Sequence, residues 1–133
     1  MSTAPSPAEP PRRATTREAA AEDFITPDAA SPAIIQAYVD QAVKANPIRA
    51  DWRDENQFLF DASRVTTPTL MLFGANDPLL DASKISFFGA LATRDRSFVV
   101  LPDSDHAAHV ENSQRAWLQA VDAFLGMPRT AAR

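Results

Sequence analysis

Residues 68–109 read PTLMLFGANDPLLDASKISFFGALATRDRSFVVLPDSDHAAH, and this stretch decides the fold. Two short apolar runs, 70–73 and 98–101, each end in a polar loop. Runs that are apolar on both faces are typical of interior parallel strands covered by helices. The segment 74–96 between them is long enough for a helical crossover. The sequence therefore predicts a βαβ unit of an α/β fold.

The elements of this unit are bounded by turn residues. We expect strands over 68–73 and 97–101 and a crossover helix over 82–93. The inner side of the crossover helix is expected to carry Ile85, Phe88, Leu91 and Ala92.

A last amphipathic helix follows the second strand. Asn112 or Ser113 is expected to supply its N-cap, and Gly126 and Pro128 to end it. Its inward face is expected to carry Trp117, Val121, Phe124 and Leu125.

The chain upstream of the βαβ unit is expected to be helical. Thr15 to Glu18 fits a capping box for a short helix that ends near Asp23. Ser31-Pro32 starts a longer helix, with Ser as N-cap and Pro in the first turn, that runs to about Ala45. The apolar face of this longer helix is expected to consist of Ile35, Tyr38, Val39, Ala42 and Val43.

Four segments follow from these patterns. We expect a disordered, proline-rich tail over 1–14, a helical lid-like segment over 15–64, a βαβα unit over 65–127 and a tail over 128–133. The predicted fold class is α/β, with a short parallel strand pair, crossover and C-terminal helices, and lid-like helices.

The composition excludes several classes of function. The chain has 133 residues, 45% hydrophobic and 23% charged, which is ordinary for a soluble globular protein. A net charge of −4 without a basic stripe argues against a nucleic-acid partner. The absence of cysteine excludes disulfides, thiolate zinc sites and thiol nucleophiles. Since no apolar run could span a membrane and no signal-like segment opens the sequence, we expect a cytoplasmic protein without a membrane partner.

One acidic cluster raises the question of a metal site. Asp51, Asp54 and Glu55 lie in an aperiodic stretch, but they lack the spacing and central glycine of a calcium loop. We interpret them as solvated acids. No metal and no cofactor are therefore predicted.

The two loops that follow the strands carry the candidate chemistry. Asp77 lies in the first loop and His106 in the second, and the carboxyl ends of adjacent parallel strands meet at one edge of a sheet. An ionised aspartate that accepts from one imidazole nitrogen fixes the tautomer, and the other nitrogen can then take a proton from a nucleophile. Asp77 and His106 are therefore the candidate catalytic residues, as orienter and base.

The same residues carry a family resemblance. The motif PTLMLFGANDPL, a helix and strand, then LPDSDHAAHVEN and a helix ending AFL closely resemble the C-terminal end of the α/β-hydrolase fold. The resemblance covers residues 65–126, with weaker similarity back to about 33, where that family places lid helices. It implies that Asp77 is the triad acid and His106 the general base.

The sequence departs from the family pattern at one position, and two other residues compete for the roles of base and orienter. That family commonly has glycine before the histidine, whereas this chain has Asp105, which would place a second carboxylate beside the imidazole. His109 is expected to be structural, and both His109 and Glu111 are expected to bond within the loop or to its neighbours. Asp81 is an alternative orienter, but it lies where a helix N-cap is wanted.

The family's nucleophile is missing from this sequence. The chain has three glycines and no serine between two of them at the G-x-S-x-G spacing of a nucleophile elbow. The oxyanion hole depends on the same elbow, so it is missing too. We therefore expect a partial domain with little activity alone.

Two functions remain open on the sequence. The first is a hydrolase C-terminal segment, whose partner is an N-terminal hydrolase half and whose substrate is an ester or an amide. The second is a non-catalytic remnant or interaction module that docks a partner, or a second copy of the chain, through its exposed sheet edge. A third class, small-molecule binding, would need a pocket between the lid helix and the His106 loop.

Overall fold

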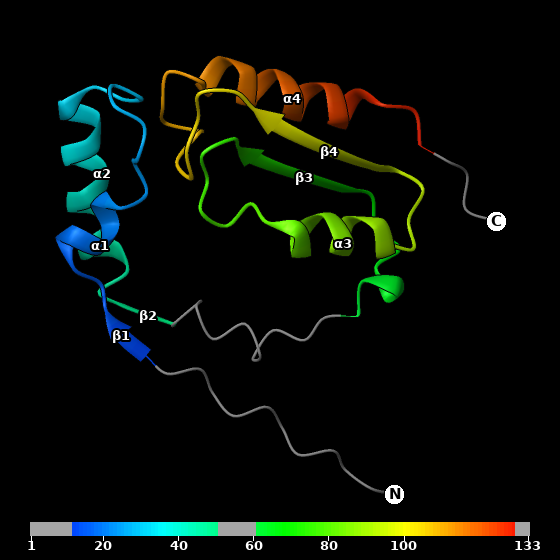
Figure 1. Ribbon diagram of the computed structural model, residues 1–133, viewed down its shortest axis with the longest axis horizontal. Helices are drawn as coiled ribbons and strands as arrows, with labels where there is room; N and C mark the ends of the chain where they lie inside the picture. Colours follow the sequence, from blue (N-terminus) through cyan, green and yellow to red (C-terminus); the bar gives the residue numbers. More distant parts are fainter. Residues whose placement is uncertain (1–11, 51–60, 130–133) are drawn as a thin grey trace, which may run out of the picture.

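A computed structural model describes residues 12–50 and 61–129 of the chain (Figure 1). The predicted acidic cluster of Asp51, Asp54 and Glu55 lies outside these residues, as does most of the predicted N-terminal tail. Mixed helices and a short parallel sheet make this a small α/β fold, as the sequence predicted.

The centre of the fold is a pair of parallel strands. Strands β3 (Thr69–Gly74) and β4 (Arg96–Leu101) pair in register, with Met71 opposite Phe98 and Gly74 opposite Leu101. Helix α3 (Ala82–Ala90) connects them and thus completes the predicted βαβ unit. Most residues of both strands are only half-buried, because a sheet of two strands is too narrow to be an interior layer.

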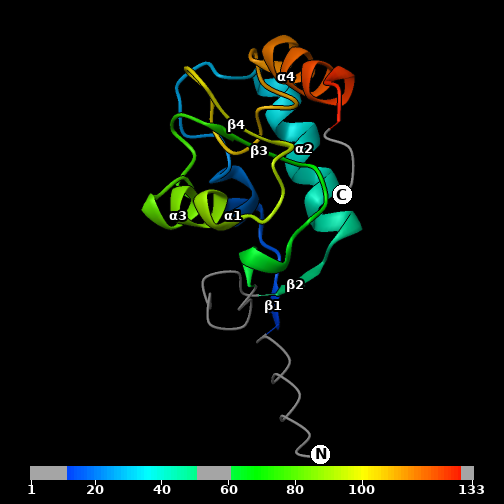
Figure 2. The ribbon, with the colours of Figure 1, turned by 90° about the vertical axis from the view of Figure 1, so that its right-hand side faces the viewer.

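Helices cover both faces of this sheet (Figures 1 and 2). Helix α3 contacts one face through Phe88, whose ring meets that of Phe98 at 5.3 Å in an edge-on arrangement. Helix α4 (Gln114–Gly126) packs on the other face, where Phe124 is buried. The arrangement is a three-layer α/β/α unit.

The helical N-terminal segment lies beyond the carboxyl ends of β3 and β4 (Figure 1). Helix α1 (Arg17–Ala21) begins one residue later than the capping box predicted, because the Thr16 hydroxyl, and not that of Thr15, accepts from the Ala19 amide. Helix α2 (Pro32–Ala45) begins at the predicted cap, where the Ser31 hydroxyl accepts from the Ile34 amide. The predicted apolar face of α2 is confirmed, since its five residues are all buried or half-buried.

Residues 12–14 differ from the prediction. They form strand β1 (Arg12–Ala14), which pairs antiparallel with β2 (Ile48–Ala50), although we expected a disordered tail there. The pair is held where it meets the end of α2, because the Thr15 amide donates to the Pro47 carbonyl at 2.9 Å. Strands of three residues are too short to be predicted from sequence periodicity.

The helix faces were predicted with three errors. Ile85 is 60% exposed and Leu125 is 66% exposed, although both were expected to face inward. Ala92, expected on the same side as Ile85, is also exposed and lies beyond the end of α3. Each narrow helix layer covers only two strands, so the outer part of its apolar stripe has nothing to pack against. Helix α3 also ends three residues early, because the Arg96 guanidinium donates to the carbonyls of Phe88, Gly89 and Leu91.

Two further segments complete the described chain. A short 3-10 helix, η2 (Ala62–Arg64), forms a turn before β3, with the Asp61 carboxylate accepting from the Ser63 amide. Within residues 12–50 and 61–129, no helix has both the length and the apolar character that a membrane span requires.

Candidate functional site

The loops after β3 and β4 are joined by backbone hydrogen bonds. The Ala75 amide donates to the Leu101 carbonyl at 2.8 Å, and the Asn76 amide donates to the Ser104 carbonyl at 2.9 Å. The parallel ladder thus extends past the strand ends into both loops. It holds the two predicted site residues at one edge of the sheet.

Asp77 and His106 meet there as predicted. The His106 Nδ1 atom lies 3.0 Å from Asp77 Oδ2, and the other Asp77 oxygen accepts from the Leu79 amide at 2.8 Å. The Asp77 side chain is 5% exposed and that of His106 is 42% exposed. A buried carboxylate held by a backbone amide therefore orients an accessible imidazole, whose Nε2 atom remains for proton transfer.

Gly74 allows the two loops to approach each other closely. A Cβ atom at this position would lie 2.2 Å from the Ser104 carbonyl oxygen and 2.3 Å from that of Asp105. Both atoms belong to the backbone just before His106. Only glycine therefore fits between the end of β3 and the loop that carries His106 (residues 102–113, called the histidine loop below).

The histidine loop is built on a buried carboxylate. Glu111 Oε2 accepts from the Asp105 amide at 2.9 Å and from the Ser104 hydroxyl at 3.0 Å. Glu111 Oε1 is also buried and has no hydrogen-bond partner among the described residues. The chain folds tightly here, and the small side chains of Ala107 and Ala108, which follow His106, are both buried.

Both side chains that were predicted to cap α4 are used by loops instead. The Ser113 hydroxyl lies 2.8 Å from that of Ser104 and makes no cap hydrogen bond, although Ser113 does occupy the N-cap position. The Asn112 side chain donates to the Asp28 carbonyl at 2.7 Å. The start of α4 was thus predicted correctly and the cap bonds wrongly.

Asp105 does not add its carboxylate to the imidazole. Its side chain is fully buried, and it accepts from the amides of Ile25 and Thr26, each at 2.6 Å, and from the Thr26 hydroxyl at 2.5 Å. The expectation of a second carboxylate beside His106 is therefore wrong. The carboxylate is satisfied by the segment that leads from α1 to α2.

The competing site residues have structural positions. The His109 ring lies against Trp117, with 6.2 Å between ring centroids, and the His109 carbonyl accepts from Gln114. Asp81 is the N-cap of α3, and hydrogen bonds from Ser83 hold the pKa of that exposed carboxyl below its usual range. Among the described residues, no group of three His, Cys, Asp or Glu side chains could hold a metal ion.

No serine among the described residues hydrogen-bonds to the His106 ring. Ser104 is the nearest in sequence, but it is fully buried and bound to Glu111. The described part of the chain therefore places a carboxylate against an accessible imidazole, with no serine hydrogen-bonded to that ring.

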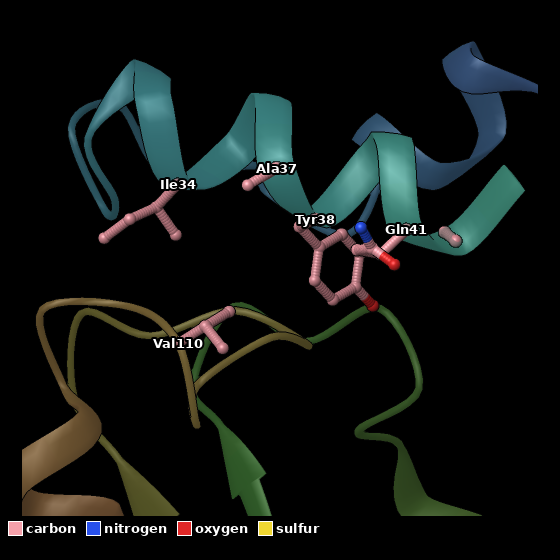
Figure 3. A pocket seen from close by; sticks show the side chains of 6 residues that line it. Ile34, Ala37, Tyr38, Gln41 and Val110 are labelled. Carbon is pink, nitrogen blue, oxygen red and sulfur yellow. The ribbon is translucent and has the colours of Figure 1, made fainter. Parts of the chain in front are cut away.

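An open apolar groove lies between α2 and the histidine loop (Figure 3). It has a volume of about 460 Å³. Figure 3 shows Ile34, Ala37 and Tyr38 of α2 facing Val110 across it, and Gln41 and Ala42 complete the lining. Sequence periodicity predicted that Tyr38 and Ala42 lie on the packing face of α2. It could not show that part of this face borders an open groove instead of packing against Val110.

Comparisons with protein-family models, curated proteins and solved structures gave no match for this chain. Any function must therefore be argued from the geometry of the site. Sequence reasoning missed Thr26 and Asn76, whose contribution depends on contacts between segments about 50 residues apart. The sequence offered one signal for each residue: Thr26 lies beside a predicted lid helix, and Asn76 lies directly before Asp77.

Proposed function

We propose that this chain supplies the acid and the base of a serine-type ester or amide hydrolase. The serine comes from outside these 133 residues, on an N-terminal hydrolase half. The observation that carries the proposal is the 3.0 Å contact between His106 Nδ1 and the buried Asp77 carboxylate. This contact is the part of a triad that sets the tautomer of the base and stabilises the imidazolium that forms during proton transfer.

The chemistry divides between the two parts. His106 Nε2 takes the proton of the incoming serine hydroxyl and later returns it to the leaving alcohol or amine. Asp77 stays ionised and holds the ring in place. The missing part contributes the nucleophile and the oxyanion hole, so the chain alone should be slower by about four or more orders of magnitude in kcat.

The sheet offers a place for the missing part to join. Thr69 and Ala75 turn their backbone amides toward β4, so the alternation of a parallel ladder turns those of Leu70 and Leu72 away from it. In the described residues the sheet ends at β3 on this side. A further strand from the nucleophile-bearing part would satisfy these groups.

Active-site labelling tests the proposal. The chain is purified from its own cells with its partners and treated with a fluorophosphonate, which reacts with activated serines. We expect a co-purifying polypeptide, and not this chain, to be labelled, and labelling to fall at least about a hundredfold with His106→Ala. His109→Ala is the matched control and should leave labelling unchanged. Labelling that ignores His106, or stoichiometric labelling of a serine in this chain, would overturn the proposal.

The second candidate is a non-catalytic interaction module that docks a partner, or a second copy, through the open edge of β3. The observation that favours it is the same row of outward-facing backbone groups. The two functions separate on one result. An interaction module keeps its partner when His106 is replaced and shows no His106-dependent labelling.

A further inference from the structure

Asp105 is the most completely buried charged residue of the described chain, and none of its carboxylate hydrogen bonds is made within its own loop. Its three donors all come from Ile25 and Thr26. A buried carboxylate is costly unless several donors satisfy it. The segment between α1 and α2 is therefore bound firmly to the residue that precedes His106.

Thr26 connects this carboxylate to the loop that carries Asp77 (residues 75–81, called the acid loop below). Its hydroxyl donates to Asp105 Oδ1 and accepts from the Asn76 side chain at 2.7 Å. Asp105 and Asn76 are the direct sequence neighbours of His106 and Asp77. One threonine thus bridges the two residues that immediately precede the base and the acid.

A second attachment secures the same segment. The Asn112 amide donates to the Ala29 carbonyl at 2.7 Å, and the Asn112 side chain donates to the Asp28 carbonyl at 2.7 Å. The segment 25–29 therefore contacts the histidine loop before and after His106 (Figure 1). This is more than a lid resting on a surface, because its backbone completes the hydrogen bonding of that loop.

We infer that Asp105 is a positioning residue: by binding Ile25 and Thr26 it fixes the histidine loop against the acid loop and so aligns His106 on Asp77. The catalytic meaning of this alignment rests on the proposed function. The alignment itself is a property of the chain alone, and it can be measured without any substrate or partner.

The measurement is the tautomer of His106, read from nitrogen-15 NMR of the full chain. A neutral imidazole can carry its proton on either nitrogen, and the hydrogen bond to Asp77 selects the form with the proton on Nδ1. We expect the wild type to show this form and Asp77→Ala to lose it. That pair of spectra calibrates the signal.

Asp105→Ala and Thr26→Val then test the inference. Asp105→Ala removes the acceptor, whereas Thr26→Val keeps the shape and both backbone amides but removes the bridging hydroxyl. We expect both to give a mixture of tautomers, and Asp105→Ala to speed amide hydrogen exchange at Ile25 and Thr26 by about tenfold or more. Asp105→Asn retains an acceptor oxygen and should restore most of the Nδ1–H form.

Asp81→Ala is the matched control, since it removes an exposed carboxylate from the α3 N-cap and should leave the tautomer unchanged. The inference is overturned if His106 keeps the wild-type tautomer when Asp105→Ala frees the Ile25 and Thr26 amides, or when Thr26→Val removes the bridging hydroxyl. In that case Asp105 only anchors the segment. If Asp105→Ala does not fold, Asp105→Asn and Thr26→Val give the decision. Failure of the labelling experiment leaves this result untouched, so the two hypotheses fail separately.

Discussion

Gly74 is the residue on which the geometry of the site depends most directly. Gly74→Ala would put a methyl group within 2.3 Å of two backbone oxygens that cannot swing aside as a side chain can. We expect the free energy of unfolding to fall by about 3 kcal/mol or more, measured by urea denaturation. The His106 tautomer should also change, because the clash pushes on the residues before it.

Gly89 provides the control for this substitution. It lies in α3, and a Cβ atom there would meet nothing within 4 Å. Gly89→Ala should therefore raise the free energy of unfolding by about 0.5–1 kcal/mol, because alanine loses less backbone entropy in a helix. A similar loss at both positions would contradict the packing argument for Gly74.

Glu111 is the residue that supports the histidine loop from inside. Glu111→Ala leaves the buried Asp105 amide and Ser104 hydroxyl without their acceptor, so we expect a loss of about 2–4 kcal/mol in the free energy of unfolding. Glu111→Gln keeps an acceptor oxygen of the same size and should lose less than half as much. Equal losses in urea denaturation would show that the charge, rather than the acceptor, is what the loop requires.

At the scale of elements, α2 is joined to the end of α1 through Tyr38. Its ring packs edge-on against Phe24 at 5.1 Å, and its hydroxyl donates to Asp23 at 2.8 Å. Burial, followed by the hydrogen bond to Asp23, raises the pKa of Tyr38 to about 12 from an ordinary value of 10.0. The folded protein thus holds the phenolic proton more tightly than the unfolded chain does.

A pH dependence follows from this shift. The stabilising contribution is complete below pH 10, where the tyrosine is protonated in both states, and it is lost as the pH rises toward 12. We expect the free energy of unfolding to fall over this range in the wild type and to fall less in Tyr38→Phe. Parallel curves for the two proteins in urea denaturation at pH 9 and 11.5 would contradict this role.

The elements also show what sequence reasoning can reach. The cap at Ser31, the parallel strand pair and the Asp77–His106 contact were predicted because local patterns and strand topology determine them. The role of Asp105 could not be predicted, since its donors lie about 80 positions away. The exposure of Leu125 was missed because a narrow sheet leaves part of an amphipathic helix uncovered.

At the scale of the whole molecule, β3 has an edge that no other described strand pairs with, and the proposed partner would join there. The amides of Met71 and Phe73 bond to β4, whereas those of Leu70 and Leu72 point outward. In dilute protein we expect Met71 and Phe73 to exchange their amide hydrogens at least about tenfold more slowly than Leu70 and Leu72, measured by NMR.

Association would change this alternation. A strand added at the β3 edge, from the partner or from a second copy, should slow exchange at Leu70 and Leu72 and leave Met71 and Phe73 unchanged. If the exchange at Leu70 and Leu72 becomes slower as the protein concentration rises, the added strand comes from a second copy of the chain. Slow exchange at all four positions at the lowest concentration would show that the edge is already covered within the chain, contrary to the proposed docking surface.

The bonds between Ile25 and Asp105 have a consequence for the order of folding. They join residues 80 positions apart, and closing so long a loop costs entropy before any contact repays it. The βαβ unit and the α1–α2 pair each rest on contacts much closer in sequence, so we expect both to form early. During synthesis the segment 25–29 leaves the ribosome well before Asp105 is made. This segment is thus made well before Asp105 but is among the last parts to reach its final place, and the candidate site is completed only at that step.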